Sequence, residues 1–276
     1  MAIKRSCVRN IVIDSAQLSQ VRNDLTKTQW ENGVATTLLN LYVIPPCQTS
    51  RIILDAIKSR DKTVTIIPER NPLLPNKADA NAHADPTNPQ AATASGKPVA
   101  PGGPLGSGAG SPVILQFAAQ DWAPAMENVS LRAGDETLLH ELIHALRQIS
   151  GLEDPSELHA PFPTLRKGDG SVSQLMAGAA GQKPTKHSQI YNHYEEFVAI
   201  LITNIYRSEN RRPGLKRDHL GDFELNYPLT NARNFLTAWR PQIEQIQAEM
   251  PVVCDQLARV NCHFNPIFEL SVARGK

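Results

Sequence analysis

The feature that most constrains the fold is the stretch at 135–151, which predicts one helix with clear signals at both ends. Asp135 suits the N-cap, and Gly151 suits the left-handed position that follows a helix. The apolar positions recur at helical spacing and cover most of the circumference: Leu139, Leu142, Ile143, Leu146 and Ile149. A helix that is apolar on most sides is typical of a protein interior, so the pattern predicts burial.

Two histidines lie one turn apart on this helix, in the sequence His-Glu-Leu-Ile-His at 140–144. Both imidazoles can reach one ion at the roughly 2.0–2.1 Å of a zinc–nitrogen bond. Glu141 projects about 100° away from His140, which places its carboxylate beside the metal rather than on it. There it can act as the general base toward a zinc-bound water. The pattern predicts one zinc ion per chain, held by His140 and His144.

A catalytic zinc needs a third protein ligand and an open position for water. The short HExxHxxGxxH spacing does not supply it, because Arg147 and Ser150 occupy the positions of that glycine and histidine. A second strongly apolar helix is predicted at 193–208, with acidic residues only at its start. Either Glu195 or Glu196 could be the third ligand.

The ligand arrangement resembles the gluzincin class of zinc peptidases, in which the ligand glutamate lies on a following helix with a small residue three positions on. Glu196 with Ala199 matches that pattern better than Glu195 with Val198. Residues 196–199 also resemble the corresponding stretch of anthrax lethal factor-type toxins. The resemblance implies that Glu196 is the third ligand, and it implies a zincin-like fold.

Residues 140–145, 203–209 and 215–219 resemble bacterial secreted-effector metallopeptidases. These include NleD-like type III effectors and metallopeptidase domains appended to type VI spike proteins, and the likeness covers roughly residues 100–225. It implies an exported toxin that cleaves a protein of a host or competitor cell, with a secretion-machine carrier and a cognate immunity protein as partners. Two other hypotheses remain: a zinc hydrolase acting on a cell-wall amide, and a non-catalytic binding protein stabilised by zinc.

Peptide hydrolysis of this kind also needs a hydrogen-bond donor for the oxyanion. Four side chains are candidates, and His219 and Tyr191 are preferred over His193 and Tyr194.

The order of the predicted elements is strands early and helices late, which indicates an α+β fold in a single domain over 1–276. Strands are expected at 8–14, 62–68 and 112–117, the last two paired. Helices are expected at 16–42 with a break near Gly33, and at 51–59, 135–150, 193–208, 230–240 and 241–260, the last interrupted by Pro251. The strand at 112–117 precedes the histidine helix. It is either a substrate-binding edge strand or an ordinary internal one.

Residues 70–111 are rich in Pro, Ala, Asn, Gly and Ser. This composition predicts a flexible insertion loop rather than a packed element.

The net charge of +1 offers no electrostatic case for binding nucleic acid. The first residues lack the apolar run of a signal peptide, and no segment has the roughly 20 apolar residues of a membrane span. The expected protein is therefore soluble, with export left to a dedicated secretion system.

Overall fold

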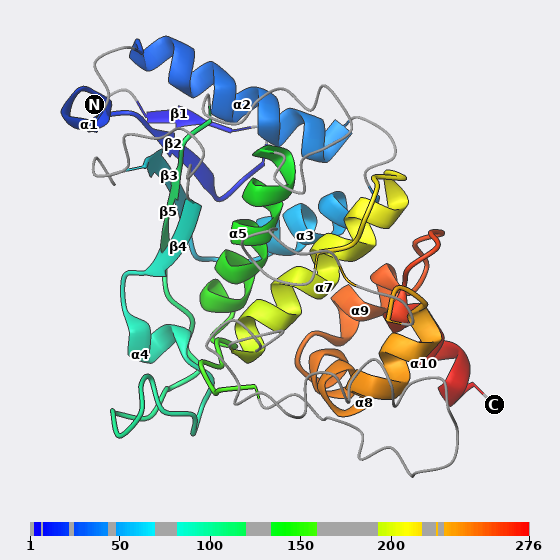
Figure 1. Ribbon diagram of the computed structural model, residues 1–276. Helices are drawn as coiled ribbons and strands as arrows, with labels where there is room; N and C mark the ends of the chain where they lie inside the picture. Colours follow the sequence, from blue (N-terminus) through cyan, green and yellow to red (C-terminus); the bar gives the residue numbers. More distant parts are fainter. Residues whose placement is uncertain are drawn as a thin grey trace, which may run out of the picture.

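The computed structural model describes residues 3–6, 8–21, 25–43, 48–69, 82–119, 134–158, 193–216, 225 and 229–275. Their sheet has five strands in the order β1-β2-β3-β5-β4 (Figure 1). The strands are β1 (Ile3–Arg5), β2 (Ile11–Asp14), β3 (Val64–Pro68), β4 (Ala82–Pro86) and β5 (Val113–Phe117). β2, β3 and β5 are parallel, and β1 and β4 are antiparallel at the two edges of the described sheet. The α+β class and the pairing of β3 with β5 are confirmed.

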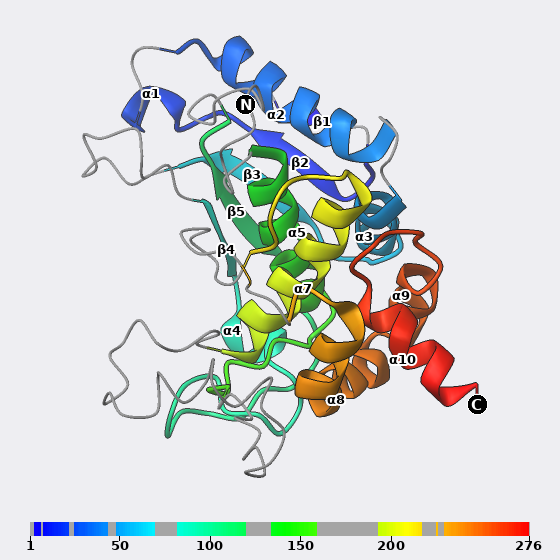
Figure 2. The same ribbon diagram turned by 45° about the vertical axis from the view of Figure 1, so that its right-hand side comes forward.

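The helices lie in layers beside this sheet. They are α1 (Leu18–Val21), α2 (Lys27–Val43), α3 (Gln48–Lys58), α4 (Pro89–Ala92), α5 (Gly134–Ile149), α7 (Tyr194–Glu209), α8 (Ala232–Glu249), α9 (Pro251–Leu257) and α10 (Pro266–Arg274). In both ribbon views α2, α3 and α5 lie on the same side of the sheet, and α7 separates α5 from α8, α9 and α10 (Figures 1 and 2). None of the described helices is long and apolar enough to cross a membrane.

Helix α5 lies at the centre of these layers, in contact with β4, β5, α2, α3 and α7. Its apolar side chains are buried, as predicted. The predicted C-terminal stop is also confirmed, because Gly151 has a φ of +67°. The N–H of Leu152 donates to the carbonyl of Arg147 at 2.9 Å, and that of Gly151 to Gln148 at 3.2 Å. These two bonds form a Schellman motif, which satisfies the last carbonyls of the helix.

The N-terminal end of α5 differs from the prediction. The helix begins at Gly134, so Asp135 lies inside its first turn and not at the N-cap. The carboxylate of Asp135 accepts a hydrogen bond from the Tyr206 hydroxyl at 2.8 Å and pairs with Arg212. These tertiary partners, 71 and 77 residues after Asp135 in the sequence, outweigh a local capping role.

A flexible loop was predicted at 70–111, and for residues 82–111 this prediction is wrong. These residues form β4, α4 and a segment packed on the end of α5. Residues 70–81 lie outside the described part. The N–H of Ser111 donates to the Gln148 carbonyl at 3.1 Å. A Cβ on Gly110 would overlap the carbonyl oxygen of Ile149. The small residues that suggested a linker therefore allow close contact between backbones.

Two predicted helix breaks also turn out differently. Gly33 lies inside the continuous helix α2, which is held by buried side chains such as Trp30 and Leu38. Pro241 lies inside α8, and the helix kinks at Trp239 (φ −120°, ψ 22°) instead of ending. Gly33 and Pro241 are unfavourable inside a helix, and the packing of their helices offsets this low helix propensity. Strands β1 and β4 and helix α10 were not predicted.

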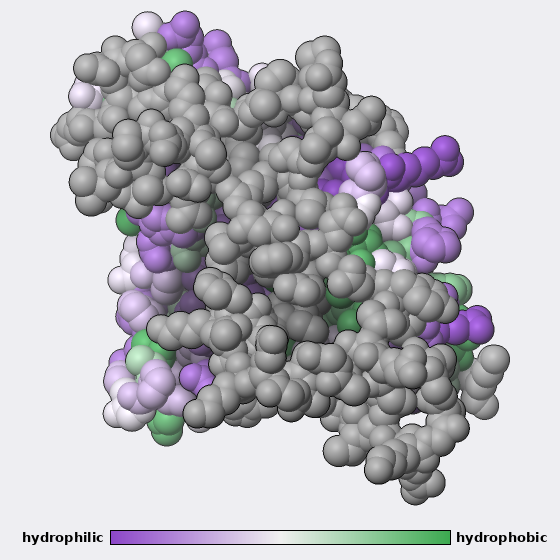
Figure 3. All heavy atoms as spheres, in the orientation of Figure 1, coloured by the Kyte–Doolittle hydropathy of each residue, from purple (hydrophilic) through white to green (hydrophobic). Residues whose placement is uncertain are grey.

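The sheet has one face toward the helices. Ile13, Ile66 and Leu115 are fully buried there, and their strand neighbours Thr65 and Gln116 are partly exposed. This alternation is expected for a sheet covered on one face. In the space-filling view, the described atoms over β4 and α4 are mostly white to purple, with scattered green residues (Figure 3). The described surface beside β4 is therefore mainly polar.

Candidate metal centre

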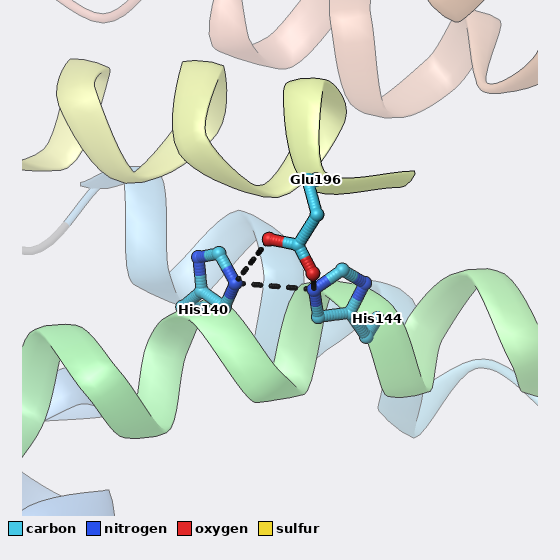
Figure 4. A group of neighbouring side chains, drawn as sticks. All are labelled: His140, His144 and Glu196. Atoms are coloured by element: carbon cyan, nitrogen blue, oxygen red, sulfur yellow. Dashed lines mark hydrogen bonds and ion pairs between the residues drawn. The ribbon is translucent and has the colours of Figure 1, made fainter. Parts of the chain in front are cut away.

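Three side chains from two helices converge on one point (Figure 4). The Nε2 atoms of His140 and His144 are 3.1 Å apart. The Glu196 carboxylate lies 3.3 Å from His140 Nε2 through one oxygen and 3.5 Å from His144 Nε2 through the other. Ligand atoms bound tetrahedrally at about 2.0–2.1 Å are separated by about 3.3–3.4 Å. The observed spacings match a single small cation, and within the described residues this is the group of three that could hold one.

The packing of α7 places Glu196 over the two histidines. Phe197, the next residue, is fully buried and stacks on Phe235 at a centroid distance of 6.1 Å. It also contacts Trp239 at 5.1 Å. Because both aromatic partners belong to α8, α8 holds α7 from the side opposite to α5. This leaves Glu196, at the adjacent helical position, directed toward His140 and His144 (Figure 4).

Two of the three donors have the charge state that a bound cation needs. Burial lowers the pKa of His140 to about 4, so its ring is neutral at physiological pH. Burial alone would raise the pKa of Glu196, but attraction to His144 outweighs it and holds that pKa well below its ordinary value. The third, His144, has a pKa held well above its ordinary value, because attraction to Glu196 outweighs burial, so a metal ion would have to take the place of a proton on this ring. Glu196 Oε2 is buried and has no hydrogen-bond partner. A buried carboxylate oxygen without a donor is costly, and a coordinated metal ion would satisfy it.

Glu141 lies on the same helix, turned toward strand β4. Its side chain is buried, and the N–H of Ala84 donates a hydrogen bond to its carboxylate. Burial is the main cause that raises the pKa of Glu141 to about 8. A carboxyl group whose pKa lies near neutrality can both take up and release a proton under physiological conditions. Glu141 thus has a position and a pKa suited to proton transfer beside the three donors.

Glu195, the alternative third ligand, lies outside the group of three. Its carboxylate is bound by the buried guanidinium of Arg147, one turn beyond His144 on α5. Of the two adjacent glutamates, the structure brings Glu196 to the histidine Nε2 atoms. Arg147 was noted in the sequence only as a departure from a longer zinc motif, and its side chain is wholly buried.

The residues predicted to stabilise an oxyanion are not brought to the site by the described structure. Tyr191 and His219 lie outside the described residues. Tyr194 is buried, and its hydroxyl donates to Glu249 at 3.2 Å. His193 is exposed at the N-cap of α7 and makes no side-chain capping bond.

Strand β4 is the part of the site that sequence reasoning missed. Ala84 has both backbone groups bound by α5: its N–H by Glu141, and its carbonyl by the Gln148 side-chain amide at 3.0 Å. The N–H and C=O of one strand residue point the same way, so β4 turns its edge at Ala84 toward helix α5. Of the two alternatives for the strand at 112–117, the structure supports the internal one, because β5 lies between β3 and β4.

Comparisons with known protein families, with curated proteins and with solved structures find no match to this chain. A function for this chain therefore has to be inferred from the geometry of the site.

Proposed function

We propose that this chain is a zinc-dependent endopeptidase with His140, His144 and Glu196 as metal ligands and Glu141 as the general base. The observation that carries the proposal is the spacing of 3.1–3.5 Å among the three donor groups. One residue after the first ligand, a buried carboxyl is placed for proton transfer. Two imidazoles and one carboxylate are a typical ligand set for catalytic zinc.

A bound zinc ion would supply a Lewis acid and lower the pKa of a water molecule. Glu141 accepts a proton at its carboxylate oxygen from the attacking water and passes it to the nitrogen of the leaving amine. The Ala84 N–H holds this carboxylate beside β4. His140 and His144 present Nε2 to the centre, and Glu196 supplies the negative charge that a divalent cation needs.

The substrate strand is β4 in this proposal. It is antiparallel to its neighbour, lies at the edge of the described sheet, and contacts the catalytic helix. An extended peptide that adds to such an edge forms backbone hydrogen bonds along it. At Ala84 it would have to replace the bonds to Glu141 and Gln148. A mixed sheet with this edge strand, a histidine helix and a third ligand on a later helix supports a zincin-like arrangement. The resemblance to effector peptidases supports a protein of another cell as the substrate.

The proposal is tested with a proteome-derived peptide library, in which mass spectrometry identifies new termini. The zinc-loaded native chain is compared with Glu141→Gln, which keeps the size of the side chain and all three ligands. We expect cleavage by the native chain, loss of cleavage on chelation, and a decrease of roughly 10²–10⁴-fold in the variant. Cleavage at the native rate by Glu141→Gln, or no cleavage by the zinc-loaded native chain, would contradict the proposal.

A further inference from the structure

The first turn of α7 carries two adjacent glutamates with different surroundings. Glu196 reaches the histidine Nε2 atoms, and Glu195 lies on the far side of the His144 ring. The His144 Nδ1 atom is 3.9 Å from Glu195 Oε2, and its Nε2 atom is 3.5 Å from Glu196 Oε1. We infer that Glu195 is a positioning residue for the metal centre, which orients His144 and holds its proton on Nδ1. This inference rests on the proposed zinc site.

The position of the Glu195 carboxylate is set by several donors. Arg147 Nε donates to both of its oxygens at 2.9 Å, and Arg147 Nη2 lies 2.8 Å from Oε1. The backbone N–H of Asp154 donates to the same oxygen at 2.7 Å. A carboxylate with this many donors in fixed directions has little freedom to rotate. It stays in its place beside His144 whether or not the centre holds a metal ion.

Arg147 is itself held on every side. It is fully buried, its Nη2 donates to the Leu152 carbonyl at 2.6 Å, and its Nη1 pairs with Glu249 at 2.7 Å. The Schellman motif at the end of α5 holds Leu152 in place through its backbone N–H. The same helix therefore supplies the ligand His144 and, three residues later, the guanidinium that holds the carboxylate facing this ligand. Residues i and i+3 share a helix face, which makes this arrangement possible.

The consequence for His144 is a defined tautomer. A neutral imidazole has one N–H and one lone pair, and the hydrogen bond at one nitrogen determines which nitrogen is free to bind a metal. In the neutral ring, the Glu195 carboxylate 3.9 Å from Nδ1 attracts the proton to this nitrogen, and the lone pair of Nε2 is then directed toward His140 and Glu196. Partners of this kind typically change metal affinity by about 10–100-fold when they are removed.

The chain offers a matched control. Glu195 and Glu249 both pair with Arg147. Of the two, Glu195 also contacts His144. Glu195→Gln and Glu249→Gln each remove one carboxylate from the same guanidinium. A purely structural role for Glu195 predicts equal effects of the two changes on zinc binding, and an orienting role predicts an effect of the first alone.

The experiment measures zinc affinity by competition with a chromophoric chelator, and the visible absorption of the cobalt-loaded protein, for the native chain and both variants. We expect Glu195→Gln to bind zinc about 10–100-fold more weakly and to change the cobalt spectrum. Glu249→Gln should match the native chain in both readouts. If Glu195→Gln does not yield folded protein, the variant Arg147→Lys is used in its place. The lysine ammonium cannot hold the Glu195 carboxylate in one orientation as the planar guanidinium of Arg147 does.

The outcomes separate this inference from the function on which it rests. Equal zinc affinity and equal cobalt spectra for the native chain and Glu195→Gln would overturn the orienting role and leave the metal centre intact. Equal losses in Glu195→Gln and Glu249→Gln would overturn it as well, because they would show a general effect on the fold. No zinc binding by the native chain would overturn the metal centre itself, and this inference with it.

Discussion

Replacing Gly110 by alanine tests whether the segment before β5 is packed on helix α5. Gly110 has a φ of +75°, and an added Cβ would overlap the carbonyl oxygen of Ile149 and lie 2.9 Å from its carbonyl carbon. The left-handed backbone costs about 1–2 kcal/mol for a residue with a Cβ. Forcing atoms into a filled space adds roughly 1–3 kcal/mol. The expected loss of unfolding free energy is therefore about 2–5 kcal/mol.

Gly96 is the matched control. It has a φ of +80°, and a Cβ there would meet nothing within 4 Å. Gly96→Ala therefore carries only the conformational cost, about 1–2 kcal/mol. The reduced entropy of the unfolded chain acts on both variants alike and cancels from the comparison. The difference of about 1–3 kcal/mol isolates the contact between Gly110 and α5.

The assay is equilibrium urea unfolding of the native chain and the two variants, followed by far-ultraviolet circular dichroism. The midpoint of Gly110→Ala should lie below that of Gly96→Ala with the same slope, because the surface exposed on unfolding is unchanged. Equal midpoints for the two variants would refute the packed arrangement of residues 82–111 and support the flexible loop that their composition suggested.

Three further outcomes are expected from contacts around the site. Phe197→Ala should cost about 3–5 kcal/mol of unfolding free energy, since it removes the fully buried ring that packs α7 on α8; a thermal unfolding shift typical of a surface mutation would count against this packing. Burial alone would raise the pKa of Asp135, but Arg212 outweighs it and lowers this pKa. The stability that Asp135 contributes is thus present above its unfolded pKa of about 3.9 and is lost as pH falls through its lower folded pKa. Asp135→Asn should therefore make the unfolding free energy fall less steeply with decreasing pH in the acid range. An unchanged pH dependence would argue against this contribution of Asp135. Asn204→Ala should lower the unfolding free energy measured in urea by roughly 1–3 kcal/mol, because the Asn204 side chain bonds both backbone groups of Lys216 at 2.7–2.8 Å. A loss below about 0.5 kcal/mol would mean that water takes over these hydrogen bonds.

The central part of the site could be predicted from the sequence because its geometry is local. His140, Glu141 and His144 lie on one helix with clear apolar periodicity, so their relative directions follow from the helical repeat. The choice between Glu195 and Glu196 depends on how α7 packs against α5, which no local pattern contains. The resemblance to gluzincins pointed to Glu196, the carboxylate that the structure brings to the histidines.

Strand β4 could not be predicted, because its residues lack the usual strand signal. The sequence Ala-His-Ala-Asp-Pro has no β-branched or aromatic residue. Its strand conformation comes from pairing with β5 and from the α5 side chains that bind Ala84, contacts between residues 27 to 64 positions apart. Tertiary contacts of this kind override local propensity. The buried Arg147 was missed for the same reason, since its partners Glu195 and Glu249 lie on other helices.

Metal content tests the central claim most directly. Inductively coupled plasma mass spectrometry of the native chain, His140→Ala and Glu196→Ala, each purified and dialysed with zinc, gives the number of ions per chain. The account predicts about one zinc in the native chain and a clear loss in both variants, because each removes one of three protein ligands. No zinc in the native chain, or an undiminished content in both variants, would contradict the metal centre and the peptidase function built on it.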